Sequence, residues 1–337
     1  MNIFLAVIFL IGGLAILWKS AELLVSGAVV LAHRLGISSL VIGLTVVAMG
    51  TSAPEVAASI AGVLQKINGG DIAVGNVFGS NIANLALVGG LIALIRPLEV
   101  RKLTLIREVP VMLAVALLLW PFLNNSHLAR PEAAALLVVF VILILLTVYG
   151  ARRESRHTRS VLSTAEGNKF KSVMQELPIE IQSMKKSVIF VLIGLAGLAL
   201  GAKITVEGAI FIGRQVGLSE GVIALTVIAL GTSLPELVTC VVAAVKGEHD
   251  ISVGNLVGSN IFNTLLVTGT AGLVRPFDIS ARFAGGIDYW IMIIVSAGFA
   301  GLIIIGKRVV GRIAGVILLS GYFAYIIYLF AFGSPNI

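Results

Sequence analysis

The chain has 337 residues, of which 58% are apolar and only 12% are charged, and its formal net charge at neutral pH is +7. A soluble protein carries about 25% charged residues. This composition therefore excludes a large soluble enzyme in which the apolar segments are buried core helices. It indicates an integral membrane protein, because the apolar segments reach the ~20 residues that a helix needs to cross a bilayer.

Ten apolar segments follow one another along the chain. Each is expected to be a helix, because backbone polar groups in lipid must be satisfied within the segment, and no alternating barrel pattern is present. The expected spans are about 2–18, 38–64, 71–95, 105–122, 132–149, 186–202, 218–245, 250–274, 287–305 and 311–331.

The positive charge is distributed unevenly over the two sides that ten spans create. Of the 24 Lys and Arg residues, eighteen fall on the side that holds the polar stretch 151–186, and six fall on the other side. The positive-inside rule then predicts a multi-pass plasma (inner) membrane protein with both termini outside and the 151–186 loop in the cytoplasm. The charge therefore reflects topology and contact with the lipid bilayer, and no nucleic-acid partner is expected.

An internal repeat divides the chain into two halves. LTVVAMGTSAPE, which ends at Glu55, returns as LTVIALGTSLPE, which ends at Glu236, with a shift of 181 residues. The 27 residues from Asp71 return from Asp250 with 16 identities. Because each half holds five spans, an odd number, the second half enters the membrane inverted, which is typical of transporters. The expected organisation is an N-terminal repeat (1–150), a cytoplasmic linker (151–186) and a C-terminal repeat (187–337).

Two glutamates stand inside the apolar spans, at matching positions of the two repeats. Glu55 lies in the span 38–64 and Glu236 in the span 218–245. An ionisable group at bilayer depth is costly and marks a functional site by default. The alternative, a protonated carboxyl kept for packing, is less consistent with two groups related by the repeat.

The neighbours of these glutamates predict discontinuous helices. Pro54 and Pro235 lack the backbone N–H and collide with the carbonyl four residues back, so each helix is expected to kink or unwind at GTS-x-PE. The following spans carry polar stripes at intervals of four residues, which favour ion coordination over helix packing because they recur beside the carboxylates. These stripes are Asn76, Ser80 and Asn84 in the first half, and Asn255, Ser259 and Asn263 in the second.

All of these candidate ligands are oxygens. Carboxylate, hydroxyl, amide and carbonyl oxygens suit Ca²⁺ or Na⁺ and argue against softer metals, which prefer imidazole or thiolate. The single cysteine, Cys240, excludes an internal disulfide, and the histidines form no zinc or haem pattern. We therefore expect no cofactor, with Ca²⁺ and Na⁺ as transported ions and H⁺ as a competitor for the carboxylates.

At these residues the chain resembles the calcium/cation antiporter superfamily, in its prokaryotic sodium/calcium exchanger branch. The resemblance rests on GTSAPE…GNVFGSNIAN and GTSLPE…GNLVGSNIFN, and the ten-span pattern extends it over the whole chain. It implies an all-α fold of ten transmembrane helices in two inverted five-helix repeats. It also implies alternating access, in which the first and sixth spans slide against the other eight.

The resemblance also implies a ligand set. The central calcium site would be Thr51, Glu55, Thr232 and Glu236. The sodium ligands would be the carbonyls of Ala48 and Ala229 with the side chains of Ser52, Ser80, Ser233 and Ser259, while Asn84 and Asn263 would line the middle of the site. Some relatives carry Asp where this chain has Asn263, so only two central carboxylates remain and the coupling ion stays open.

Exchange of Ca²⁺ for Na⁺ is the leading hypothesis. The alternatives are H⁺/Ca²⁺ or K⁺-dependent Na⁺/Ca²⁺ exchange through the same glutamates, and a passive cation channel, which would show flux without a counter-ion. An intramembrane enzyme with paired carboxylates as acid and base is disfavoured, since no nucleophile or metal motif accompanies them. No obligate protein partner is evident in the sequence.

Overall fold

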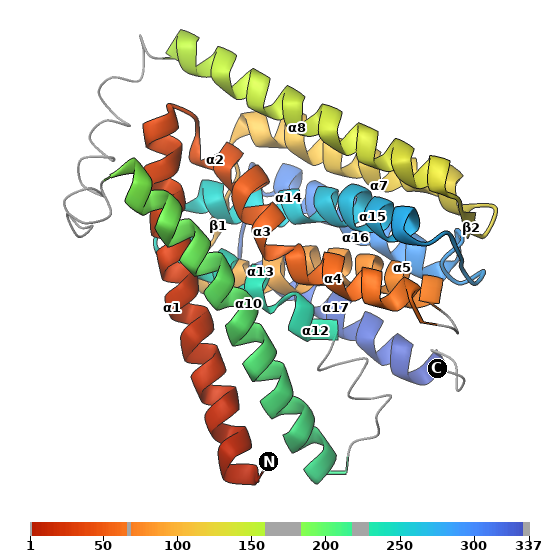
Figure 1. The fold of residues 1–337 in the computed structure, drawn as a ribbon. Helices are drawn as coiled ribbons and strands as arrows, with labels where there is room; N and C mark the ends of the chain where they lie inside the picture. Colours follow the sequence, from red (N-terminus) through yellow and green to blue (C-terminus); the bar gives the residue numbers. More distant parts are fainter. Residues whose placement is uncertain (1, 66–68, 159–182, 218–228, 333–337) are drawn as a thin grey trace.

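The computed structural model describes residues 2–65, 69–158, 183–217 and 229–332. Within these ranges the fold is helical apart from four two-residue strands (Figure 1). In the first half the elements are α1 (Ile3–Leu35), α2 (Ser39–Ile42), the π-helical segment η1 (Gly43–Val47), α3 (Ala48–Thr51), α4 (Ala53–Val63), α5 (Gly69–Ile82), η2 (Ala83–Val88), α6 (Gly89–Ile95), β1 (Leu98–Glu99), η3 (Thr104–Glu108), α7 (Val109–Leu123), β2 (His127–Leu128) and α8 (Arg130–Thr158).

The second half repeats much of this order. Its elements are α10 (Met184–Gln215), α12 (Ala229–Thr232), α13 (Leu234–Val245), α14 (His249–Phe262), η6 (Asn263–Val267), α15 (Thr268–Val274), β3 (Phe277–Asp278), α16 (Ile287–Ile305), β4 (Val309–Val310) and α17 (Arg312–Phe332).

The described helices are those of a multi-pass membrane protein. Eight of them are long and apolar enough to cross a bilayer, and the pair Ser39–Thr51 and Ala53–Val63, bent by 41°, makes a ninth. The predicted span 218–245 begins on residues 218–228, outside the described residues, and its remainder contains the short apolar helix α13. The segments Gly69–Ile95 and His249–Val274 are the most deeply buried of the candidate spans, so they form the centre of the molecule.

The first and sixth spans are longer than the sequence predicts. The predictions 2–18 and 186–202 are wrong in their ends, because α1 has 33 residues and α10 has 32. Lys19 does not end the first helix, since its ammonium group pairs with Glu22 at 2.8 Å, three residues later on the same helix face. The helix ends instead at Gly36, which adopts a left-handed conformation (φ 66°) and so accommodates the turn without a Cβ penalty. The fifth span is also extended, since α8 continues from its predicted end at 149 to Thr158.

Helices α1 and α10 pack closely along one side of the molecule and run in opposite directions (Figure 1). Glycines form the contact. A Cβ atom on Gly13 would lie 2.3 Å from Thr205 Oγ1, and one on Gly201 would lie 3.0 Å from the Gly13 carbonyl oxygen. Small residues allow this approach, which membrane helices use because lipid provides no hydrophobic force between them.

Two short antiparallel ribbons join the halves of the chain. β1 pairs with β4 through Leu98 and Val310, and β2 pairs with β3 through Leu128 and Phe277. Each ribbon therefore takes one strand from each half. In the repeat alignment β1 corresponds to β3 and β2 corresponds to β4. The β1–β4 ribbon and the β2–β3 ribbon are therefore related by the internal repeat.

Two arginines make matching contacts across the halves. Arg96 Nη1 donates to the carbonyls of Ala244 (3.3 Å) and Val245 (3.0 Å) at the end of α13. Its repeat equivalent, Arg275, donates to the carbonyls of Val63 and Gln65, both at 3.3 Å, at the end of α4. Each arginine thus satisfies terminal carbonyls and faces the negative end of a helix from the other half.

The glycine contact generates a stability prediction with a neighbouring control. Gly13→Ala should lower the thermal unfolding temperature of the detergent-solubilised protein, because the new methyl group forces α1 and α10 apart at a cost of about 1–3 kcal/mol. Gly12→Ala should leave it unchanged or raise it, since a Cβ there meets nothing within 4 Å and alanine favours helix. Equal melting temperatures for the two variants would contradict the close contact.

Candidate ion-binding site

Both copies of the GTS-x-PE motif interrupt their helix at the serine. Ser52 separates α3 from α4 with φ −82° and ψ 5°. Ser233 separates α12 from α13 with φ −88° and ψ 4°. Pro54 and Pro235 then fit the first turn of the new helix. Backbone N–H groups in a first turn have no acceptor within the helix, so a proline there costs no hydrogen bond. The predicted break at both motifs is confirmed.

The break gives each glutamate a helix N-terminus. Glu55 lies in the first turn of α4 and Glu236 in the first turn of α13. Both side chains are buried, with 0% and 1% of their surface exposed. The unpaired N–H groups and the dipole of a helix N-terminus favour a negative charge there, so the backbone partly compensates the burial of each carboxylate.

Each carboxylate receives a hydrogen bond from the serine of the opposite half. Ser52 Oγ donates to Glu236 Oε1 at 3.1 Å, and Ser233 Oγ lies 3.4 Å from Glu55 Oε1. Ser233 Oγ is also 3.3 Å from Ser80 Oγ on α5. The two motifs therefore meet in one buried cluster, and each half completes the polar surroundings of the other half's glutamate.

Neither glutamate has a basic partner among the described residues. Asp288 shows the usual alternative, since this equally buried carboxylate pairs with Arg282 and accepts a hydrogen bond from Tyr325 Oη at 3.2 Å. Burying an unpaired carboxylate costs several kcal/mol, and buried charges are normally paired or coordinate metal ions. Glu55 and Glu236 are thus placed as a cation site would place them.

Several buried polar atoms of the predicted ligand set have no hydrogen-bond partner within the described part of the chain. They are Oε2 of Glu55 and of Glu236, Oγ of Ser259, and both side-chain amide atoms of Asn84 and of Asn263. Buried polar atoms almost always have a partner, so unpaired atoms in these side chains fit a polar or ionic ligand.

The two asparagines lie in π-helical segments. Asn84 is the second residue of η2, and its repeat equivalent Asn263 is the first residue of η6. π-Helical segments are rare in proteins overall, and those that occur often lie at functional sites, because the wider turn redirects a side chain. The sequence gives no signal for this local geometry.

Beside each glutamate lies a supporting network that the predicted ligand set does not include. Asn76 Nδ2 donates to the Glu55 carbonyl at 3.1 Å and to Ser59 Oγ at 2.9 Å. In the second half Asn255 Nδ2 donates to Cys240 Sγ at 3.2 Å, and Cys240 occupies the position equivalent to Ser59. The polar stripes contain Asn76 and Asn255, so the signal was present in the sequence. The structure uses these amides to hold the glutamate helices.

The remaining predicted residues lie around the same breaks. The Ala48 carbonyl accepts from Ser52 N at 3.0 Å and lies 3.3 Å from Thr51 Oγ1, which is also 3.1 Å from Asn255 Oδ1. Ala229 and Thr232 belong to α12, which packs against α4 and α5. The structure therefore brings the two motifs into contact with Asn76 and Ser80 of the first stripe and with Asn255 of the second.

The donor set is made of oxygens, with Cys240 Sγ already engaged by Asn255. Within the described residues no group of three or more His, Cys, Asp or Glu side chains could hold a metal ion. Two carboxylates with hydroxyl, amide and carbonyl oxygens fit a hard cation such as Ca²⁺ or Na⁺ better than zinc or copper.

Comparison with known proteins decides the family. The sequence matches the family described as "Sodium/calcium exchanger protein" over residues 5–149 and again over 186–331. The chain belongs to the sodium/calcium exchanger family. This is a family of transporters, within the calcium/cation antiporter superfamily that the motifs resemble, so the chain is a membrane antiporter of cations.

Individual relatives cover nearly the whole exchanger. It is 32% identical to the sodium/calcium exchanger MaX1 of Methanosarcina acetivorans over 96% of this chain and 98% of that protein. It is 37% identical to the inner membrane protein YrbG of Escherichia coli over 97% of each chain. Among solved structures, the sodium-calcium exchanger NCX_Mj soaked with zero Na⁺ and Ca²⁺ matches with a TM-score of 0.79 and 27% identity, over 97% of this chain and 100% of that one.

The asparagine networks generate the prediction for this site. Cys240→Ala should destabilise the protein by about 1–3 kcal/mol, because Asn255 Nδ2 loses its acceptor in a fully buried position. Cys240→Ser should be close to neutral, since it recreates the hydroxyl of Ser59 in the first half. Thermal unfolding in detergent compares the two variants, and Ser59→Ala should resemble Cys240→Ala. A Cys240→Ser variant as unstable as Cys240→Ala would show that the hydrogen bond from Asn255 to residue 240 does not contribute to the stability of the protein.

Proposed function

We propose that this exchanger moves Ca²⁺ against Na⁺ and binds the two ions alternately between Glu55 and Glu236. The observation that carries the proposal is the burial of both carboxylates without a basic partner in the described residues. With both carboxylates ionised, the site would carry a charge of −2, which favours occupancy by one divalent cation or by several monovalent ones and makes crossing of an empty site costly. Competition for shared ligands is then the physical basis of exchange.

In this proposal the ligands are divided between the two ions. Thr51, Glu55, Thr232 and Glu236 bind Ca²⁺, and Na⁺ uses the carbonyls of Ala48 and Ala229 with Ser52, Ser80, Ser233 and Ser259, while Asn84 and Asn263 line the middle. The orphaned oxygens of Glu55, Glu236 and Ser259 support this division, because each is buried and lacks a protein partner in the described residues.

The proposed architecture is ten transmembrane helices in two inverted repeats, 1–150 and 187–337, joined by the linker 151–186. Support comes from the paired ribbons and from Arg96 and Arg275, which make equivalent contacts from opposite halves. The positive-inside rule gives the proposed orientation, with both termini outside and the linker in the cytoplasm.

Alternating access would come from movement of α1 and α10 against the remaining helices. α10 covers both motifs: a Cβ atom on Gly50 would lie 2.4 Å from Leu195 Cδ2, and one on Gly231 would lie 2.3 Å from Val206 Cγ2. A displacement of α10 along its axis would move its apolar side chains away from one GTS-x-PE motif and onto the other. The close packing of α1 on α10 supports their movement as one body.

Sodium is the proposed coupling ion, and protons or potassium are the alternatives. MaX1 and NCX_Mj are described as sodium/calcium exchangers, which supports sodium. Protons could occupy the same carboxylates, so the test has to separate the two gradients.

Reconstitution into liposomes tests the proposal. Vesicles loaded with Na⁺ and diluted into Na⁺-free buffer should take up radioactive calcium, and equal Na⁺ on both sides should abolish the uptake. Glu55→Gln and Glu236→Gln should each reduce uptake to background, because one charge is lost from a site that must neutralise a divalent ion. Ser52→Ala should weaken uptake by about tenfold, through the lost hydrogen bond to a charged group.

Glu99→Gln is the matched control. The Glu99 carboxylate is exposed on β1, so this variant should take up calcium as the native chain does. An imposed pH gradient that drives uptake in the absence of Na⁺ would replace sodium by protons as the coupling ion. Uptake that needs no gradient, or full activity without either glutamate, would refute the antiporter mechanism at this site.

A further inference from the structure

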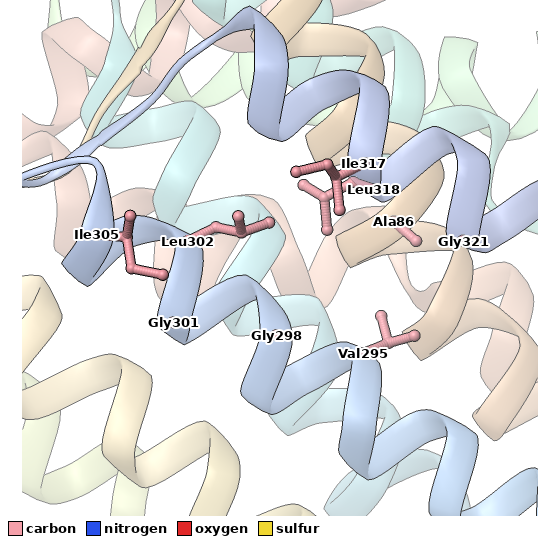
Figure 2. Close-up of a pocket in the computed structure, with 9 residues that line it drawn as sticks. All are labelled: Ala86, Val295, Gly298, Gly301, Leu302, Ile305, Ile317, Leu318 and Gly321. Carbon is pink, nitrogen blue, oxygen red and sulfur yellow. The ribbon is translucent and has the colours of Figure 1, made fainter.

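An apolar groove lies between α16 and α17, and none of the residues that line it belongs to the candidate ion site (Figure 2). Its volume is about 370 Å³, and its floor is formed by Ala86 of η2. The walls carry Leu302 and Ile305 from one helix and Ile317 and Leu318 from the other. Ile305 and Ile317 are 79% and 53% exposed, so the groove opens toward the surface that faces lipid.

Glycines create the hollow without being needed for helix contact. A Cβ atom on Gly298, Gly301 or Gly321 would meet nothing within 4 Å. The glycines of the α1–α10 contact differ, since their Cβ atoms would clash with backbone. From Gly298 to Ile305 the groove follows α16 for about 10 Å and reaches the end of that helix. The shape and lining suit an extended alkyl chain.

A basic turn stands where the groove ends. Gly306 to Val309 joins α16 to β4, and Val309 N donates to the Gly306 carbonyl at 3.0 Å. Its central residues, Lys307 (φ 51°) and Arg308 (φ 74°), are both left-handed. This is the pattern of a type I′ turn, which strongly prefers Asn-Gly because other side chains are strained at positive φ. Lys307 and Arg308 therefore occupy positions at which Asn and Gly would be conformationally more favourable.

The charge at this turn is uncompensated. Lys307, Arg308 and Arg312 are exposed, and no carboxylate of the described residues forms an ion pair with them. Glu99 is the nearby acidic residue, on β1 opposite Val309, and it is exposed as well. A cluster of basic side chains beside an apolar groove matches a ligand with an anionic head and an apolar tail.

We propose that the α16–α17 groove and the Lys307–Arg308–Arg312 cluster bind an anionic phospholipid. One acyl chain lies in the groove against Ala86, and the phosphate contacts the basic turn. The groove floor belongs to η2, the same segment that carries Asn84. A bound chain therefore packs behind a helix that lines the ion site and stabilises it from the lipid side.

Lipid titration of the full-length, detergent-solubilised protein tests the site, with phosphatidylglycerol and phosphatidylcholine compared by native mass spectrometry and by melting temperature. The native chain should bind and be stabilised by phosphatidylglycerol in preference to phosphatidylcholine. Lys307→Asn/Arg308→Gly should weaken phosphatidylglycerol binding by about 25-fold, since each basic residue near an anionic lipid contributes about fivefold. The same variant should melt higher than the native chain without lipid, because Asn-Gly relieves the turn.

Two further variants separate groove from charge. Gly301→Leu fills the hollow and should weaken phosphatidylglycerol binding by about tenfold while the basic turn stays intact. Arg130→Gln/Lys203→Gln removes the same charge from exposed positions elsewhere and should bind as the native chain does. Equal binding of the two lipids, or unchanged binding in both site variants, would overturn the proposal. Stabilisation by inorganic phosphate equal to that by phosphatidylglycerol would also overturn it, since the turn would then hold a free anion.

Discussion

Two buried carboxylates without a basic partner in the described residues are the constraint on which the rest of this structure depends. Glu55 and Glu236 would each destabilise an apolar interior by several kcal/mol if nothing compensated their charge. The backbone supplies part of that compensation, because the break at Ser52 or Ser233 starts a new helix directly before each glutamate. The motif therefore combines two functions, since the proline that permits the break also positions the carboxylate at a helix N-terminus.

The rest of the compensation comes from the opposite half of the chain. Ser52 reaches Glu236 and Ser233 reaches Glu55, so neither half contains a complete site. The same crossing occurs at the far ends of the glutamate helices, where Arg96 and Arg275 bind the last carbonyls of α13 and α4. Both ends of each glutamate helix are thus held by the other half. Because these contacts fix α4 and α13, they are consistent with the proposal that α1 and α10, which contact each other through glycines, move against the remaining helices.

The sequence identified the motifs that meet in the buried cluster, but it did not predict the geometry of the helices around them. The glutamates, prolines and polar stripes could be found because each feature occurs twice in register, which distinguishes a site from an ordinary polar residue in a span. The lengths of α1 and α10 could not be found by hydropathy, since the lysine that seemed to end each span pairs within its helix: Lys19 with Glu22 in α1, and Lys203 with Glu207 in α10. The π-helical turns at Asn84 and Asn263 were also missed, because they depend on tertiary packing and leave no pattern in the residue types. Arg96 and Arg275 occupy equivalent positions of the repeat, but a basic residue at the end of a span is expected from topology alone, so their contacts with α13 and α4 could not be predicted.

In the proposed site, the two amides limit the charge that the exchanger can balance. The two carboxylates would be neutralised by one Ca²⁺ or by two Na⁺, and Asn84 and Asn263 would contribute oxygens without contributing charge. A third Na⁺ would leave the occupied site with a net charge of +1, so its translocation would depend on the membrane voltage. A carboxylate at position 263 would change this balance by one unit and favour an additional monovalent cation. In the proposed site, Asn at both repeat positions therefore sets the charge that crosses the membrane with the bound ions.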